Sequence, residues 1–170
     1  ETKRRWEAKG NDMEQKNRTK PLMICLWILF IAYALLLVRI TLFKQASLYD
    51  LFAAVGASER SLNLVPFRAL FGMIRENAPL ARLWENIAGN IALFIPLGFL
   101  LPILTKWSPG RAILCGALTS LTIDVLQYIF MLGVTDIDDL LLNTAGAALG
   151  SLLFCLFRRA FGDGRRLLVA

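Results

Sequence analysis

The chain has 170 residues, of which 56% are hydrophobic and 19% are charged, with a formal charge of +6 and no histidine. A soluble domain of this length is markedly less apolar, so the composition predicts one integral membrane domain and argues against a nucleic-acid-binding protein. The absence of histidine excludes a Ser-His or Cys-His nucleophile pair and any histidine-ligated metal site.

The first 20 residues are polar and mixed in charge, which predicts a disordered cytoplasmic tail. The chain does not begin with Met, and Met13 precedes a plausible start, so residues 1–12 are assigned no function. Pro21 to about Phe43 is nearly continuous in apolar residues, and about 20 such residues cross a bilayer as a helix. Arg39, in its last turns, either extends to the interface or is a counter-charge for an aspartate.

Residues 44–85 form a long connection in which four arginines, Arg60, Arg68, Arg75 and Arg82, interrupt apolar positions. This pattern predicts one or two short helices in the membrane interface, including the stretch LYDLFAAV at 48–55, with Trp84 at headgroup level. Arg68 has the planar fork that binds a phosphate or a carboxylate. Its alternative role is that of an ordinary interfacial arginine.

The second predicted span is Asn86 to about Leu104, with Asn86 and Asn90 one turn apart in its first turns. Pro96 and Gly98 lie inside it and predict a broken helix, which a membrane tolerates where neighbouring groups satisfy the freed carbonyls.

The third predicted span is Arg111 to about Met131, with a polar and small stripe at helical spacing formed by Gly116, Ser120, Asp124 and Gln127. A lipid-facing Asp124 would cost roughly 2.5–3.5 kcal/mol on an insertion scale, so it is expected to face the bundle interior.

The fourth predicted span is about Ile137 to Phe157, and Asp136, Asp138 and Asp139 stand at its head. One face carries Asp139, Asn143, Gly146 and Gly150, so its small end would let a second helix approach closely. Thr135-x-x-Asp138 has the form of a capping box, and capping alone accounts for Asp136 and Asp138. It does not account for Asp139 with Asn143. Asp138, which is offset from the face of Asp139 and Asn143, is the best candidate for a residue that only caps the helix.

Basic residues set the expected topology. Thirteen Lys and Arg residues lie in the two terminal segments and in the short turn at 105–111. Six lie on the other side, namely Arg39 and five in residues 44–85. The positive-inside rule then places both termini in the cytoplasm and the long connection outside.

This topology brings the intramembrane polar residues into the outer half of the bundle, as a candidate functional cluster of Asn86, Asn90, Asp124, Gln127, Asp136, Asp139 and Asn143. Arg39 and Arg68 are its candidate anion-binding groups, and Gly146 and Gly150 its helix-packing residues. A purely structural role, as hydrogen bonds between helices, is the alternative. No cofactor is expected; if a metal binds, Asp124, Asp136 and Asp139 would form an all-oxygen site suited to Mg²⁺.

Four motifs stand in a fixed order: NLVPF at 63–67, NIAGNIALFIPLGFLLP at 86–102, SLTIDVLQ at 120–127 and TDIDDLLLNTAGAALG at 135–150. Together they resemble the VanZ-like family of bacterial membrane proteins. The resemblance implies a VanZ-like membrane domain over residues 21–158, followed by a basic cytoplasmic tail at 159–170. Where the family usually has Glu in the third motif, this chain has Asp124.

The expected fold is an all-α, multi-pass protein of the bacterial cytoplasmic membrane, with four transmembrane helices. The resemblance implies a role in low-level resistance to teicoplanin and related lipoglycopeptides, or in envelope homeostasis, through an outward-facing polar site. The partners would be the lipid bilayer and a lipoglycopeptide or a lipid-linked envelope molecule. The alternative is a small membrane enzyme that acts on a lipid-linked phosphate or sugar with its aspartates, with or without Mg²⁺. A transporter is a third hypothesis.

Overall fold

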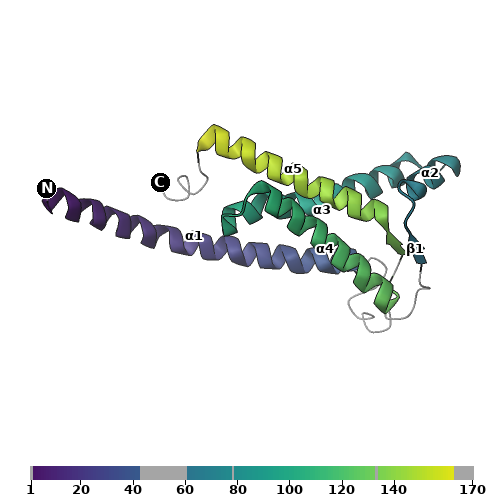
Figure 1. Cartoon of the computed structure of the whole chain (residues 1–170), viewed down its shortest axis with the longest axis horizontal. Helices are drawn as coiled ribbons and strands as arrows, with labels where there is room; N and C mark the ends of the chain where they lie inside the picture. The colour runs from purple at the N-terminus through teal and green to yellow at the C-terminus, as the bar shows by residue number, and fades with distance from the viewer. Residues whose placement is uncertain (1, 43–60, 78, 133, 163–170) are drawn as a thin grey trace.

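The computed structural model describes residues 2–42, 61–77, 79–132 and 134–162. Its elements, in chain order, are the helix α1 (Thr2–Leu42), the strand β1 (Ser61–Asn63), the helices α2 (Arg68–Arg75), α3 (Leu80–Thr105) and α4 (Pro109–Phe130), the strand β2 (Val134–Asp136) and the helix α5 (Ile137–Phe161) (Figure 1).

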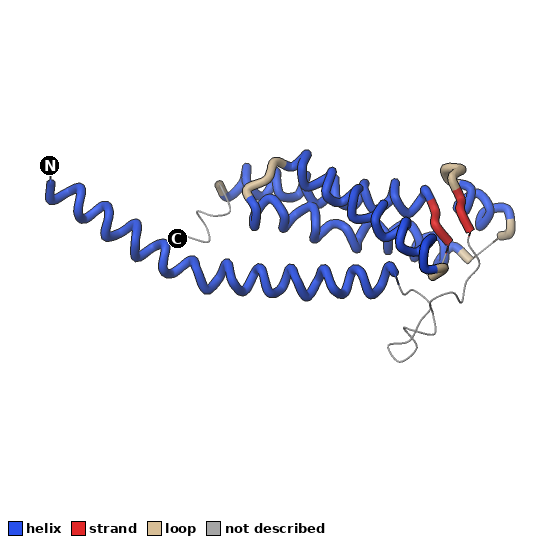
Figure 2. The backbone as a smooth tube through the Cα atoms, turned by 60° about the horizontal axis from the view of Figure 1, so that its bottom comes forward, coloured by secondary structure: helices blue, strands red, loops and turns tan. Residues whose placement is uncertain are grey.

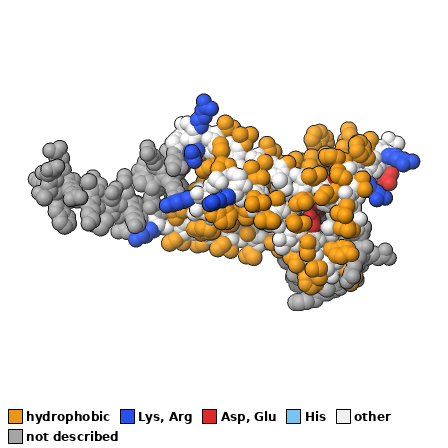
Figure 3. All heavy atoms as spheres, viewed as in Figure 1, with side chains coloured by type: hydrophobic (Ala, Val, Ile, Leu, Met, Phe, Trp, Pro, Cys, Tyr) orange, Lys and Arg blue, Asp and Glu red, His pale blue; other side chains and the backbone are white. Residues whose placement is uncertain are grey.

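Four helical segments are long and apolar enough to cross a membrane: Lys20–Leu42, Leu80–Thr105, Pro109–Phe130 and Ile137–Phe161. The predicted all-α, four-span membrane fold is therefore confirmed. Leucine and isoleucine side chains on the helix surfaces are exposed, such as Ile28 at 61% and Leu35 at 68%. Figure 3 shows hydrophobic side chains over most of the visible helical surface, with Lys and Arg gathered toward its two ends. Such a surface suits contact with lipid tails.

The helices α3, α4 and α5 form the bundle, and α3 and α5 share its largest interface. Phe94, Leu97 and Leu101 of α3 are buried in the core that they form with Leu37 of α1 and Ile123 of α4. The helix α1 lies along this bundle through its C-terminal turns and separates from it toward the N-terminus (Figure 2). Its contacts include Leu37, which is 2% exposed, and a hydrogen bond from the Tyr33 hydroxyl to the Leu93 carbonyl.

Two parts of the secondary structure differ from the sequence-based expectation. Residues 2–20 continue α1, where the sequence predicts a disordered tail. Most of these residues are good helix formers, and the apolar helix that follows removes the cost of nucleation. The helix α3 is unbroken although it contains Pro96 and Pro102. A proline removes one backbone hydrogen bond, and the packing of Phe94 and Leu97 on either side of Pro96 keeps the helix in place.

The connection between the first two spans contains α2, one of the short helices expected there. Its position in the membrane interface stays a prediction, as does the headgroup depth of Trp84, which is 65% exposed in the first turns of α3. The predicted helix at 48–55 lies outside the described residues. At the other end of the chain α5 extends through Arg158 and Arg159, which the sequence assigns to the basic tail.

A short parallel ladder, which the sequence does not predict, joins β1 and β2, with Ser61, Leu62 and Asn63 opposite Val134, Thr135 and Asp136. The N-terminal end of α1 and the C-terminal end of α5 lie at one end of the molecule, and the ladder with α2 lies at the other (Figure 1). The start of α1 and the end of α5 therefore lie at the same end of the bundle, as an even number of spans requires.

Candidate functional site

Apart from Ser151, the buried polar side chains of the described residues belong to the region where α1 and α4 end, where α3 and α5 begin, and where the β1–β2 ladder packs. Figure 1 shows these parts of the elements together at one end of the molecule. We call this region the polar end and define it by Asn63, Asn86, Asn90, Ser120, Asp124, Gln127, Asp136, Asp138, Asp139 and Asn143. Its members come from five elements, so it exists only in the folded chain. Four contacts, described next, hold these segments together.

The first contact joins the connection to α5 through Asp136. This residue is the last of β2 and the N-cap of α5, and its carboxylate accepts a hydrogen bond from the Asp138 backbone N–H at 3.0 Å. The same Oδ1 accepts from the Asn63 side-chain amide at 3.0 Å, from the opposite position of the ladder. An N-cap of this kind stabilises a helix by typically about 1 kcal/mol. Asp136 therefore caps α5 and fixes β1 against it.

The second contact overturns the prediction that Asp138 is only a cap. Its side chain is 2% exposed, and its Oδ1 accepts a hydrogen bond from the Phe67 backbone N–H. Phe67 has φ 61°, a left-handed conformation that is uncommon for a bulky residue, and it immediately precedes α2. The buried carboxylate thus holds the turn into α2 against α5. Asp138 lies in the first turn of α5, but the N-cap residue of this helix is Asp136.

The third contact joins α3 to α5 through Asp139. The Asn90 side-chain amide donates to Asp139 Oδ1 at 2.6 Å and to Asn86 Oδ1 at 3.2 Å. Asn90 is 5% exposed, whereas Asn86 and Asp139 are half-buried. The spacing of Asn86 and Asn90 suggested a shared face, and the structure places both on the side of α3 that meets α5.

The fourth contact involves the polar stripe of α4. Ser120 is 1% exposed, and Asp124 and Gln127 are each 5% exposed, so the stripe faces the bundle interior as its burial cost requires. Ser120 Oγ accepts from the Asn143 side-chain amide of α5 at 2.8 Å. The Gln127 amide donates to the Thr41 carbonyl of α1 at 2.9 Å. The stripe therefore bonds α4 to helices on two sides.

The polar end also contains hydrogen-bonding capacity that protein groups do not use. Among the residues that the structure describes, the buried side-chain oxygens without a hydrogen-bond partner are Gln127 Oε1, Asp138 Oδ2 and Asn143 Oδ1. All three are acceptors, and a buried unsatisfied acceptor costs about 1–3 kcal/mol. A polar molecule with N–H or O–H donors would remove that cost, so this region suits such a ligand better than an apolar one.

The two candidate anion-binding arginines lie in different surroundings. Arg39 is half-buried in α1, two residues before Thr41. Arg68 is exposed at the start of α2 and lines a cleft of about 450 Å³ together with Asn63, Glu76 and Asp136. The structure thus brings Arg68 to the Asp136 side of the polar end.

The proposed all-oxygen metal site does not form as a group of three. Within residues 2–42, 61–77, 79–132 and 134–162, no three Asp, Glu or Cys side chains come together in a way that could hold a metal ion. Asp136 is occupied with capping and with Asn63, and Asp139 is held by Asn90.

Close packing of α3 on α5 sets the position of these polar contacts. A Cβ atom at Gly146 would lie 2.3 Å from the Ile91 carbonyl oxygen, and one at Gly150 would lie 2.1 Å from that of Ile95. In the reverse direction, a Cβ atom at Gly98 would lie 2.0 Å from the Ala147 carbonyl oxygen. The two backbones are therefore in direct contact, as the small face of the fourth span suggests. Gly98, which the sequence presents as a helix breaker, belongs to this interface.

The sequence gives no sign of several groups that take part in these contacts. Asn63 stands out only as part of the motif NLVPF, and nothing in the pattern points to Thr41 or to the Phe67 N–H. Thr135 was considered as a cap, but its hydroxyl donates to the Asp124 carbonyl at 3.0 Å. No periodicity could reveal them, because each acts through a contact between segments that are distant in the sequence or through a backbone group.

Comparison with known proteins gives two matches. A family model described as VanZ/LLP1 matches residues 30–158. A relative from Enterococcus faecium, named Protein VanZ, is 35% identical over 127 residues, which cover 73% of this chain and 70% of the relative. No solved structure matches the chain. The matched residues include the polar end and most of all four apolar helices.

Proposed function

The chain belongs to the VanZ-like family, and from this premise we propose that it is a bacterial envelope factor that contributes to low-level resistance to teicoplanin and related lipoglycopeptides, or to envelope homeostasis. We propose that it does so through the polar end, facing outward from the cytoplasmic membrane. Its partner would be the lipoglycopeptide itself or a lipid-linked envelope molecule. This function is binding or modulation and involves no bond-breaking step.

One observation carries the proposal. Apart from Ser151, the buried polar side chains of the described residues gather at one end of the bundle, where they include Asp124 and Asp138, with the half-buried Asp139 beside them. Intramembrane carboxylates are costly, and proteins retain them mainly at functional positions. The acceptor oxygens of Gln127, Asp138 and Asn143 supply capacity for a polar ligand. Structural bonding between helices explains the paired groups but gives no reason for the unpaired acceptors.

The test is the minimal inhibitory concentration of teicoplanin for a susceptible Gram-positive host that expresses the chain. Expression should raise it, and Asp124→Asn and Asp139→Asn should abolish the gain at unchanged membrane levels. The amide keeps the shape and can still accept a hydrogen bond from Asn90, so a loss is attributable to charge.

Glu85→Gln is the matched control, because Glu85 is an exposed carboxylate in the first turns of α3 outside the polar end. It should keep full protection. Equal protection by the parent and by both aspartate variants would assign the polar end a purely structural role. A loss of the protein from the membrane in those variants would point to the same conclusion.

The alternative function is a membrane enzyme that acts on a lipid-linked phosphate or sugar. The observation in its favour is the cleft in which Arg68, a group that binds phosphate as a fork, lies with Asp136. Asp124 or Asp139 would then serve as the acid or base, with or without Mg²⁺. Release of phosphate from a lipid-linked substrate by the purified chain, and its loss in Arg68→Gln, would favour this function over the first.

A further inference from the structure

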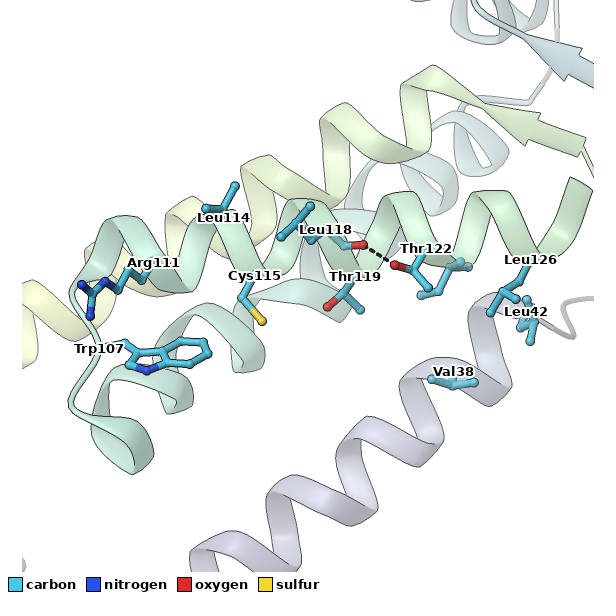
Figure 4. Close-up of a pocket in the computed structure, with 11 residues that line it drawn as sticks. Val38, Leu42, Trp107, Arg111, Leu114, Cys115, Leu118, Thr119, Thr122 and Leu126 are labelled. Atoms are coloured by element: carbon cyan, nitrogen blue, oxygen red, sulfur yellow. Dashed lines mark hydrogen bonds between the residues drawn. The ribbon is translucent and has the colours of Figure 1, made fainter.

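A groove of about 490 Å³ runs between α1 and α4, on a different part of the molecule from the polar end's ladder and loop (Figure 4). Its walls are aliphatic, with Val38 and Leu42 from α1 and Leu118 and Leu126 from α4. Of the two threonines in its wall, Thr122 has its hydroxyl occupied, because it donates to the Leu118 carbonyl at 2.7 Å. The groove is therefore a hydrocarbon-lined space along a membrane-spanning helix.

The helices α1 and α4 are close together at one end of the groove and apart at the other. Leu42 and Leu126 lie at the end where α1 meets α4 (Figure 4). A hydrogen bond from the Gln127 amide to the Thr41 carbonyl joins the two helices next to this end. Toward Trp107 and Arg111, α1 diverges from α4 (Figure 4). An occupant would enter from the side of the α3–α4 turn.

The dimensions fit a single hydrocarbon chain. From Arg111 to Leu126 the groove follows α4 for about 22 Å at the rise of an α-helix. One leaflet of the hydrocarbon core is about 15 Å thick, so a lipid tail that starts at the surface can run along most of this length. Dividing the volume by the length gives a mean cross-sectional area on the order of 20 Å². An area this small suits a single extended hydrocarbon chain. A helix, about 10–12 Å across with its side chains, is far too wide.

The open end carries positive charge. Arg111 and Lys106 are exposed there, and no Asp or Glu occurs in the sequence between Glu85 and Asp124. Trp107, at the mouth of the groove, is an aromatic residue of the kind that occupies the headgroup region. A basic group next to an apolar slot between transmembrane helices suits an anionic lipid headgroup.

We propose that the groove between α1 and α4 binds one acyl chain of an anionic phospholipid, whose phosphate pairs with Arg111. The lipid comes from the leaflet that meets the α3–α4 turn. It fills the space that α1 leaves as it diverges, so it stabilises the contact of α1 with the bundle. This site is independent of the proposed resistance function.

The experiment is native mass spectrometry of the full chain, released from micelles that contain phosphatidylglycerol and phosphatidylcholine in equal amounts. The parent should retain one phosphatidylglycerol in preference to phosphatidylcholine. Arg111→Gln should lower the retained phosphatidylglycerol about five-fold, as expected for one basic contact near a membrane surface. Arg159→Gln is the charge control, because Arg159 is exposed at the end of α5 and does not line the groove.

A second pair of variants tests the apolar slot. Thr119→Trp fills the groove and should abolish retention, whereas Leu121→Trp, on the exposed face of α4 outside the groove, should not. If Thr119→Trp fails to fold, the two arginine variants decide the proposal on their own. Equal retention of both lipids, equal losses in Arg111→Gln and Arg159→Gln, or a dimer that Thr119→Trp dissociates would each overturn it.

Discussion

Adding one methyl group to Gly98 or Gly150 should separate the two most closely packed helices of the bundle. The new Cβ would lie 2.0 Å from the Ala147 oxygen in Gly98→Ala and 2.1 Å from the Ile95 oxygen in Gly150→Ala. Ordinary contact begins at 3.4 Å, so each atom is more than about 1 Å too close. The opposing atoms belong to the backbone, and no side chain can rotate away. The helices α3 and α5 must therefore move apart.

The free energy of unfolding should fall by about 1–3 kcal/mol in each variant, which is the usual cost of overpacking. The loss should lie in the upper part of that range because the separation also stretches hydrogen bonds across the interface. These bonds are Ser151 Oγ to the Gly98 carbonyl at 3.2 Å and Asn90 to Asp139 at 2.6 Å. Gly146→Ala, 2.3 Å from the Ile91 oxygen, should behave in the same way.

The assay is equilibrium unfolding in mixed micelles, followed by circular dichroism. Gly89→Ala is the matched control, because Gly89 lies on α3 and a Cβ atom there meets nothing within 4 Å. It should leave stability unchanged or raise it by up to about 1 kcal/mol through helix propensity. If the free energies of unfolding of Gly98→Ala and Gly150→Ala lie within about 0.5 kcal/mol of that of Gly89→Ala, the backbones of α3 and α5 are not in contact.

Two further predictions concern Asp138 and the orientation in the membrane. Asp138→Ala removes the acceptor of the Phe67 N–H, so amide exchange at Phe67 should accelerate and stability should fall by about 1–3 kcal/mol, whereas Glu85→Ala should change neither. Unchanged exchange at Phe67 would mean that the carboxylate does not hold this turn. In a background without Cys25, Cys115 and Cys155, an impermeant thiol reagent should label Glu76→Cys but not Ser108→Cys on intact cells, since basic residues dominate the side with the α3–α4 turn. Labelling of Ser108→Cys alone would place the polar end in the cytoplasm.

The spans could be predicted because each depends on a local property. About 20 apolar residues in sequence are enough to cross a bilayer, whatever else the chain does. The same reasoning placed Asp124 in the interior, because a carboxylate that faces lipid is costly. The small face of Gly146 and Gly150 also follows from helical periodicity. The family resemblance, which rests on four ordered motifs, is confirmed by the match over residues 30–158.

The connection could not be predicted in the same way. The strands β1 and β2 have three residues each and pair across about 70 intervening residues, so neither carries a recognisable alternation of its own. Without that pairing, Asn63 has no visible relation to Asp136. Two hydrogen-bonding partners at the start of α5, the Asn63 amide and the Phe67 N–H, therefore belong to a segment that the sequence predicts only as an interfacial connection.

Asp138 shows why the role of an acidic residue at a helix start depends on what packs beside it. Adjacent residues of a helix point about 100° apart, so Asp138 and Asp139 face different neighbours. Asp139 faces α3 and binds Asn90, whereas Asp138 faces the turn into α2 and binds the Phe67 N–H. The sequence predicts α3 but not the turn into α2. It therefore indicates a place in the polar cluster for Asp139 and only a capping role for Asp138.

The same contacts determine which oxygens of the polar end remain open to a ligand. Asp136 Oδ1 accepts from the Asn63 amide and a backbone N–H, and Asp138 Oδ1 accepts from a backbone N–H. Both carboxylates are therefore fixed in place through a single oxygen. Asp138 Oδ2 is buried and has no hydrogen-bond partner. A region built only to join helices gains nothing from that open acceptor, whereas a site that binds a polar ligand with N–H or O–H donors can use it.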